Sequence, residues 1–330
     1  GDLWLASSLA VEEANRAGGF RGVPFRLMPA WSEDPWGTGV ARLARAVYND
    51  GGWAVIGSID GASTHLAEQV VAKARLTLIA PAGTDKTVNY ANVAWMFSCL
   101  PSDDRWAEVL AEALEDEIGR RPFTLITTTD HDSRAATVEL RGSLNRRGVG
   151  PLHHLELEVG TEDLGDVAER VAKSDSEAVV VLSGPIDTAR LVVALRERRD
   201  DLALFGGPSV DRRAFREQAG AAAGGVRFPL LCDPAAATSE FGRNFESRFG
   251  RRADCPTVQA YDATRLLIAA IRDAGLNRAR IRDSVEALSP WPGAAGAVEF
   301  GPVGQNRRTV RLARIAQGGG GVVSGDGPFP

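Results

Sequence analysis

The chain is poor in lysine, cysteine and histidine, and its net charge is negative. Only Lys73, Lys86 and Lys173 are lysines among its 38 basic residues. Because nucleic-acid-binding proteins normally present a basic face, a net charge of -5 leads us to expect no nucleic-acid partner. The excess of arginine serves oxyanion recognition or reflects genome composition. The second reading is favoured, because the arginines are scattered beside Asp and Glu.

Long apolar runs and nucleotide-binding loops are also missing. No apolar run reaches the roughly 20 residues that a membrane-spanning helix requires, so we expect no span in this chain. A Walker-type phosphate loop needs a Gly-Lys pair, and none occurs; the GxGxxG dinucleotide pattern is absent as well. We therefore expect no cofactor of these kinds.

Patterns of catalytic and metal-binding residues are equally scarce. There is no GxSxG nucleophile elbow, and the four histidines show neither HxxxH nor HExxH spacing. Asp130, His131 and Asp132 are consecutive, so their side chains splay in different directions and would need further ligands to hold a metal ion. We expect neither a metal site nor an enzyme.

The three cysteines match no zinc-binding pattern. Cys232 and Cys255 pair as a disulfide if the chain is exported, which leaves Cys99 free. Free buried thiols are the alternative, and the spacing does not choose between them.

Strand-like and helix-like segments alternate along most of the 330 residues. Strands are predicted at 23–28, 53–56, 76–80, 93–98, 123–128, 154–158, 178–182, 202–205, 226–231, 298–300 and 309–315. Helices are predicted at 3–17, for about three turns after Pro35, at 62–74, from Ser102 or Asp103 to 117, at 133–147, 162–173 and 187–199, and from near Thr238 and Val258. The Gly-rich tail from Gly318 is expected to fray. Two such series predict an α/β fold with two doubly wound parallel-sheet domains.

Ligands of such folds bind at the carboxyl ends of the strands, where loops lead into helices. The loop GSIDGAST offers backbone N–H groups and the hydroxyls of Ser58, Ser63 and Thr64. Its Asp60 either caps the following helix or faces a ligand. The loop APAGTD offers small residues and a hydroxyl, while its Asp85 stabilises the loop, caps a helix or binds a cation.

The turn TTTDHDSRAA offers a third candidate loop. Here Asp132 is the expected helix cap, and Asp130 is the residue expected to face a ligand.

Five segments form a recognisable set and follow one another in order: EEANRAGGFRG, VIGSIDGAST, IAPAGTD, PSDDRWAEVLAEAL and VQAYDATRLLIAAIRDAG. In these segments the chain resembles the type I periplasmic binding proteins. More narrowly, it is similar to the branched-chain amino acid (Leu/Ile/Val-binding) type of ABC-transporter solute-binding protein.

The resemblance implies two lobes joined by three crossovers around a cleft. With crossovers near Leu100, Asp233 and Pro302, the first lobe is expected at 1–100 and 234–302, and the second at 101–233 and 303–330. A small-molecule ligand would close the lobes by a hinge motion, and the closed form would be read by an ABC transporter membrane permease. An exported, periplasmic or extracellular protein follows, and a ligand-sensing domain of a receptor or regulator is the alternative.

The resemblance also implies a set of ligand-binding residues. In the first lobe they are Asp60, Gly61, Ala62, Ser63, Ala82, Gly83, Thr84 and Val258; in the second they are Asp130, His131, Ser133, Gly184, Pro208 and Ser209. Several positions depart from the family. Gly61 replaces a serine, Ser133 stands where a tyrosine is common, and Pro208 and Ser209 stand where an acidic residue often pairs with the ligand ammonium. Either Asp130 pairs with the ligand ammonium instead, or the ligand is not a standard amino acid. A small polar or aromatic metabolite is favoured over a leucine-like ligand.

The start of the chain departs from the family as well. The family opens with a strand and a loop before its first helix, whereas here Gly1 begins at that helix. We expect the first lobe to lack a strand and its first cleft loop. Either the true N-terminus is absent from this sequence, which is the favoured reading, or the lobe is shortened.

Overall fold

The computed structural model describes residues 1–30, 38–318 and 321–324, and they form two compact α/β units. Unit 1 comprises Gly1–Ser102 and Cys232–Arg308, and unit 2 comprises Asp103–Leu231 and Thr309–Pro330. The predicted α/β fold with parallel sheets is confirmed.

Unit 1 contains a three-stranded parallel sheet of order β1-β2-β3. Its strands are β1 (Ala54–Ile56), β2 (Thr77–Ala80) and β3 (Met96–Ser98). Its helices are α1 (Asp2–Arg16), α2 (Val40–Tyr48), α3 (Gly61–Ala74), α4 (Thr87–Tyr90), α10 (Glu240–Phe249), α11 (Cys255–Ala274) and α12 (Arg278–Ala287), with a 3-10 turn at η4 (Pro234–Thr238).

The alternation of side chains along β2 builds the core of unit 1 on both faces of the sheet. Leu78 and Ala80 pack with residues of α2, α3 and α4, while Ile79 between them packs with α11 and α12. This follows from the two-residue period of a strand, and a strand buried on both faces reads as a continuous apolar run. The run LTLIA is therefore explained by its position in the middle of the sheet.

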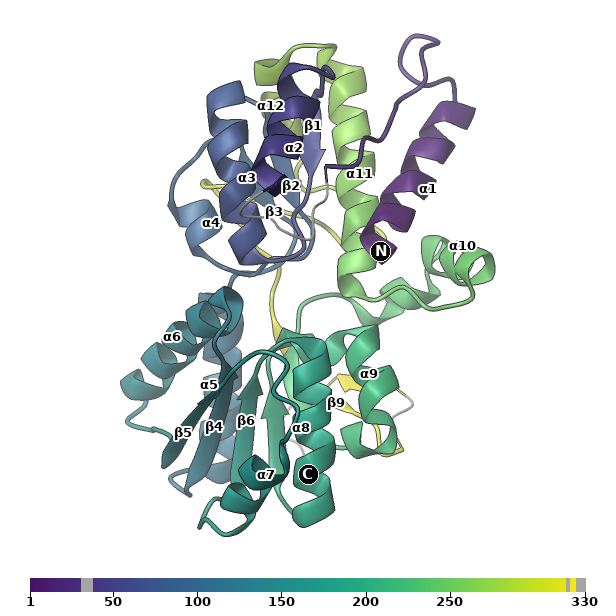
Figure 1. The fold of residues 1–330 in the computed structure, drawn as a ribbon. Coiled ribbons are helices and arrows are strands. Elements are labelled where there is room, and N and C mark those ends of the chain that lie inside the picture. The colour runs from purple at the N-terminus through teal and green to yellow at the C-terminus, as the bar shows by residue number, and fades with distance from the viewer. Residues whose placement is uncertain (31–37, 319–320, 325–330) are drawn as a thin grey trace. The chain divides into compact units, whose positions relative to one another are not determined.

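Helix α1 packs along α11, although the two are far apart in the sequence (Figure 1). The hydroxyl of Tyr261 on α11 donates to Glu13 on α1 at 2.6 Å, and Arg272 donates to the carbonyl of Ala14 at 2.9 Å. Helix α11 has 20 residues. Even so, no helix in the described part of the chain combines the length and the apolar character needed to cross a membrane.

Unit 2 is built on a seven-stranded sheet of order β10-β9-β8-β7-β6-β4-β5. Its strands are β4 (Phe123–Thr128), β5 (His153–Leu157), β6 (Ala178–Leu182), β7 (Ala203–Gly206), β8 (Arg227–Leu230), β9 (Arg311–Ile315) and β10 (Val322–Ser324). Its helices are α5 (Asp103–Ile118), α6 (His131–Arg146), α7 (Gly165–Ala172), α8 (Pro185–Arg198), α9 (Arg213–Ala219) and the 3-10 turns η2 (Pro208–Asp211) and η3 (Gly220–Ala223).

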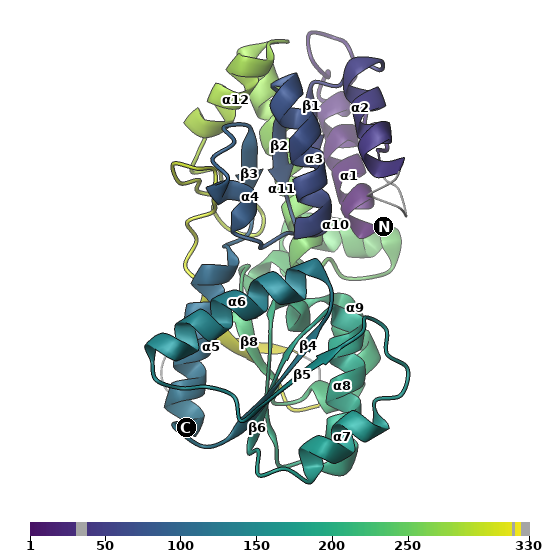
Figure 2. The same ribbon diagram turned by 60° about the vertical axis from the view of Figure 1, so that its left-hand side comes forward.

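The sheet of unit 2 lies between two layers of helices (Figure 2). Helices α7, α8 and α9 share a core with β6 and β7 on one face, and α5 and α6 pack together on the other. Strands β4 to β8 are parallel, and β9 and β10 are antiparallel additions. The strand order reverses between β4 and β6, which makes the loops after these strands the switch point where ligands of such sheets bind.

The chain remains with unit 1 beyond Pro302. The backbone N–H of Ser98 donates to the carbonyl of Gly304 at 2.9 Å, and the buried side chain of Asn306 donates to the carbonyl of Cys99 at 2.8 Å. These bonds hold the segment beside β3, so the chain passes to unit 2 only after Arg308. The passage completes when β9 pairs with β8.

Two predicted strands are wrong. The segment 23–28 makes only the single bridge Phe20↔Val23, because the side-chain amide of Asn15 takes both backbone groups of Phe25, at 2.7 and 2.9 Å. The segment 298–300 forms isolated bridges rather than a ladder. An extended segment becomes a strand only when a neighbouring backbone supplies regular hydrogen bonds.

The prediction for the C-terminal tail is corrected in part. Val322–Ser324 form β10, which pairs antiparallel with β9. Pro35, from which a helix was predicted, lies outside the described residues; the helix α2 itself begins at Val40. Trp53 lies just before β1 rather than in it.

Candidate functional site

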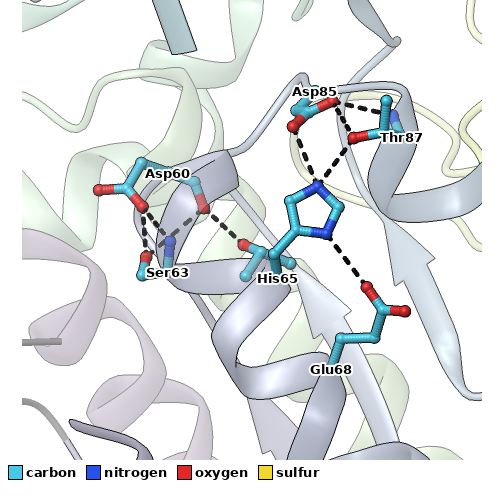
Figure 3. Close-up of polar contacts among 7 residues, drawn as sticks. Asp60, Ser63, His65, Glu68, Asp85 and Thr87 are labelled. Atoms are coloured by element: carbon cyan, nitrogen blue, oxygen red, sulfur yellow. Dashed lines mark hydrogen bonds and ion pairs between the residues drawn. The ribbon is translucent and has the colours of Figure 1, made fainter. Parts of the chain in front are cut away.

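The turn between β1 and α3 is organised by Asp60. This residue is the N-cap of α3, and its carboxylate accepts from the backbone N–H of Ser63 at 2.7 Å and from the Ser63 hydroxyl (Figure 3). The Thr64 hydroxyl donates to the Asp60 carbonyl at 2.6 Å and accepts from the N–H of Ser58 at 3.3 Å. Of the two roles that the sequence allowed for Asp60, the structure shows the cap, which also compensates the positive end of the helix dipole.

The predicted loop after β2 touches the turn after β1. A Cβ atom added to Gly83 would lie 3.4 Å from the carbonyl carbon of Asp60 and 3.5 Å from the nitrogen of Gly61. Because β1 and β2 are neighbouring parallel strands, their carboxyl ends share one edge of the sheet. Ala82 and Thr84 flank Gly83 and are partly exposed. Two short loops with small side chains therefore meet at this edge.

His65, which was not predicted as a site residue, connects α3 to the loop after β2 (Figure 3). Its Nδ1 lies 3.1 Å from a carboxylate oxygen of Glu68 on the same helix. Its Nε2 lies 3.1 Å from a carboxylate oxygen of Asp85 and 2.8 Å from the hydroxyl of Thr87. Asp85 is only 5% exposed and accepts from the N–H of Thr87 at 2.8 Å, so its predicted role in stabilising the loop is observed. The HxxE spacing of His65 and Glu68 was the available signal in the sequence.

In unit 2 the turn between β4 and α6 repeats the capping arrangement. Asp130 is the N-cap of α6 and accepts from the N–H of Ser133 at 2.9 Å and from its hydroxyl at 2.7 Å. The hydroxyl of Thr128 donates to the same carboxylate at 2.6 Å. The predicted cap at Asp132 is wrong, because Asp132 already lies inside α6.

Hydrogen bonds within the turn stabilise the negative charge of Asp130. Burial raises the pKa of Asp130, but the hydrogen bonds from Thr128 and Ser133 outweigh burial and leave the pKa below its ordinary value. Its two oxygens are used by groups of its own turn. This carboxylate therefore serves as a cap and is poorly suited to ligate a metal ion together with His131, the exposed residue beside it.

Hydroxyl groups tie together the loops that follow β6 and β7. The fully buried Thr188 on α8 lies 2.8 Å from the hydroxyl of Ser183 and 3.2 Å from that of Ser209, measured between oxygens. Gly184 precedes α8 as its N-cap and is exposed, and Pro208 opens η2. The structure thus brings three predicted residues of unit 2 to the same carboxyl edge as Asp130 and Ser133. Thr188 was not predicted.

Helix α11 carries the remaining predicted residue, Val258, which is 1% exposed. The helix is capped by Asp254, which accepts from the N–H of Thr257 at 3.3 Å, so it begins before Val258. Cys255 in its first turn forms a disulfide with Cys232. The structure therefore selects the disulfide from the two states that the spacing left open.

Cys99 is a free and fully buried thiol. Burial raises the pKa of Cys99 far above its ordinary value, and Asp262 adds to this effect. Since the thiolate is the reactive form, a thiol in this setting is inert and fills space in the core.

Residues 2–321 match the family described as periplasmic binding protein. The chain belongs to the periplasmic binding protein family. The family resemblance predicted from the five sequence segments is confirmed. No curated protein matches the chain.

Solved structures with the same fold include transporter binding proteins. One is the branched-chain amino acid transporter substrate-binding protein LivJ from Streptococcus pneumoniae in complex with isoleucine, at 18% identity and a TM-score of 0.85 over 98% of this chain and 94% of that one. A second is the leucine-binding protein LivK from Thermotoga maritima, at 18% identity and a TM-score of 0.83 over 98% and 92%. A third is a solute-binding protein of an ABC transporter from R. palustris in complex with benzoate, at 13% identity and a TM-score of 0.83 over 98% and 91%.

The TM-scores establish the shared fold. The first of these structures holds isoleucine and the third holds benzoate.

Proposed function

We propose that the chain is the extracytoplasmic solute-binding protein of an ABC importer, which captures a small polar metabolite and delivers it to a membrane permease. Membership of the periplasmic binding protein family supports the proposal. The main structural support is that the loops after β1 and β2 in unit 1 lie in contact, with Gly83 close to the backbone of Asp60 and Gly61. No catalytic role is assigned to these residues.

In this proposal each unit binds the ligand with the loops at the carboxyl edge of its sheet. Unit 1 uses Gly61, Ala62 and Ser63 at the start of α3 together with the residues 82–84. Unit 2 uses the turn that Asp130 caps and the loops after β6 and β7. Closure of the units by a hinge motion then retains the ligand, because contacts made only in the closed form shift the population toward it.

The capping role of Asp60 bears on where an acidic group of the ligand would lie. Its carboxylate occupies the Ser63 N–H and places a negative charge at the start of α3, where an acidic ligand group would be repelled. An acidic group is better placed against the loop 82–84, whose Thr84 supplies a hydroxyl. We propose an amino acid or a related carboxylate or aromatic compound as the ligand.

A thermal-shift screen with isoleucine, leucine and benzoate, followed by calorimetry on those that bind, tests the proposal. Thr84→Val removes the hydroxyl and keeps the shape, so it should weaken binding about five- to tenfold, the effect of one hydrogen bond. Thr84→Ser keeps the hydroxyl and is the matched control. Equal affinities of the unsubstituted protein and Thr84→Val for every binding probe would remove Thr84 from the site.

Small-angle scattering with and without a binding probe tests the closure. We expect a smaller radius of gyration in the bound state. Identical scattering profiles under saturating probe would refute capture by hinge motion while leaving the binding measurement intact.

A further inference from the structure

His65 holds the loop after β2 from the side of α3. It lies one helical turn after Gly61, and its ring is bracketed by acceptors from two elements (Figure 3). Glu68 faces Nδ1 from α3, and Asp85 faces Nε2 from the loop, both at 3.1 Å. The side chain of His65 is 28% exposed, whereas that of Asp85 is 2% exposed.

The protonation state of the ring decides whether this arrangement is attractive. A neutral imidazole has one N–H and one acceptor nitrogen, so it can donate to only one of the two carboxylates and turns a lone pair toward the other. The imidazolium donates to both, and charge-assisted hydrogen bonds are the stronger kind. A cationic partner also stabilises a buried carboxylate such as Asp85, because taking a charge out of water is costly.

The two carboxylates that face the ring both favour its charged form. The hydrogen bond with Asp85 raises the pKa of His65 most; burial opposes it, and Glu68 adds to the increase. Thr87 from α4 contributes an uncharged hydroxyl, which also donates to the other oxygen of Asp85 at 2.7 Å.

We propose that His65 is a positioning residue whose charged form holds Asp85, and with it the loop 82–84, against α3, so that ligand affinity falls as the pH rises and the ring loses its proton. Asp85 directly follows Thr84, so a shift of Asp85 displaces the residues that the proposed function assigns to the ligand. The inference rests on the proposed function only in that assignment.

The direction of the pH effect follows from the linkage between protonation and structure. A group whose pKa is raised in the folded protein contributes stability that is complete below its ordinary pKa, about 6.5 for histidine, and that is lost as the pH rises through the raised value. The loop should therefore be held best at mildly acidic pH and loosen toward alkaline pH.

Amide hydrogen exchange of the ligand-free protein tests the positioning without any ligand. Protection factors of 82–87 should fall about three- to tenfold between about pH 6 and pH 9, as expected when one charge-assisted hydrogen bond weakens. His65→Gln should show the lower protection already at about pH 6 and little further change. His153→Gln replaces an exposed histidine of unit 2 and should behave like the unsubstituted protein.

Protection in 82–87 that is equal in His65→Gln and the unsubstituted protein at mildly acidic pH would overturn the positioning role. If His65→Gln also lowers protection in β3, the substitution has disturbed the sheet, and the unsubstituted protein then provides the test. A loss of its protection with rising pH that is confined to 82–87 supports the positioning role. No loss of protection with rising pH overturns it. Glu68→Gln removes the negative charge of the partner on the same helix and should retain most of the protection.

Calorimetry with isoleucine, leucine or benzoate, whichever binds, supplies the second readout. The affinity of the unsubstituted protein should weaken by a similar factor over the same pH range, and that of His65→Gln should not. If the affinity does not change with pH although the exchange data show that 82–87 loses protection, the link between His65 and the ligand is overturned. Failure of every probe to bind, with the exchange result intact, would instead count against the proposed function.

Discussion

The two units fix the loops at their carboxyl edges with different chemistry. In unit 1 the loops after β1 and β2 are joined through His65 and Asp85, which are ionisable groups. In unit 2 the loops after β6 and β7 are joined through the hydroxyls of Ser183, Thr188 and Ser209, which do not titrate in the physiological range. Only the first of these connections should respond to pH.

The two units also differ in the size of their sheets. Within the described residues the sheet of unit 2 has seven strands and that of unit 1 has three. Unit 1 adds a disulfide between Cys232 and Cys255, and an ion pair between Arg251 and Asp2 at 2.6 Å links the segment before α11 to α1. Unit 1 thus has a covalent link and an ionic link between segments outside its sheet.

The largest expected effect comes from removal of this disulfide. The double variant Cys232→Ser with Cys255→Ser should lower the free energy of unfolding of unit 1 by about 3 to 4 kcal/mol, the loop-closure value for the 23-residue separation. Native-state hydrogen exchange should show the loss in α11 and spare β6. An equal loss in β6 would mean that the units unfold as one block, and the comparison of separately stabilised units would fail.

The hydroxyl connection in unit 2 should contribute less and be independent of pH. Thr188→Val keeps the shape of a fully buried side chain and leaves Ser183 and Ser209 without their shared partner, at a cost of about 1 to 2 kcal/mol. Urea unfolding at mildly acidic and mildly alkaline pH should give the same difference from the unsubstituted protein. Thr161→Val, at a partly exposed position in a surface turn, is the control and should change stability by less than about 0.5 kcal/mol. A cost that varies with pH would show that the two connections are not chemically distinct.

The smallest expected effects belong to the two aspartate caps. Asp60→Ala should lower the free energy of unfolding by about 1 kcal/mol, the usual cost of losing a helix cap. Asp130→Ala should cost somewhat more, because the carboxylate of Asp130 also accepts from the buried Thr128 hydroxyl. The pKa of Asp130 is lowered in the folded protein, so its contribution is complete above the ordinary value and disappears as the pH falls through the lowered one. Unfolding curves of the unsubstituted protein and of Asp130→Ala, recorded between neutral and strongly acidic pH, should therefore differ at neutral pH and converge in strong acid.

The substitutions Asp60→Asn and Asp130→Asn serve as controls for the caps. Asparagine caps nearly as well as aspartate, so both variants should stay close to the unsubstituted protein at neutral pH. If Asp60→Ala is the more damaging of the two alanine variants, the assignment of extra hydrogen bonds to the cap of unit 2 is wrong.

The sequence predicted the elements whose local pattern and tertiary environment agree. The run AVVVL is strand β6, and the capping pattern DGAS marks the start of α3. The segment 23–28 reads equally well as a strand, yet the backbone N–H and carbonyl of its Phe25 are bonded to the side chain of Asn15, ten residues earlier. Local propensity cannot show whether a partner strand is present.

The candidate site was likewise predictable only in part from the sequence. Loops at the carboxyl ends of strands follow from the alternation of strands and helices, which is why Asp60, Gly83 and Asp130 could be named. His65, Asp85 and Thr188 gained their roles from partners about 20 residues away or on another element. The identity of the capping residue in the second turn was missed because two aspartates compete and only the backbone geometry selects Asp130.

The sequence by itself determined the fold class, the family and the position of the loops, because periodicity and short motifs depend on neighbouring residues. Only the tertiary structure decided that Cys232 pairs with Cys255, that the chain stays beside β3 through Asn306, and that His65 lies between two carboxylates. These are contacts between segments that the chain brings together on folding. Their geometry depends on how whole elements pack, and no local pattern encodes it.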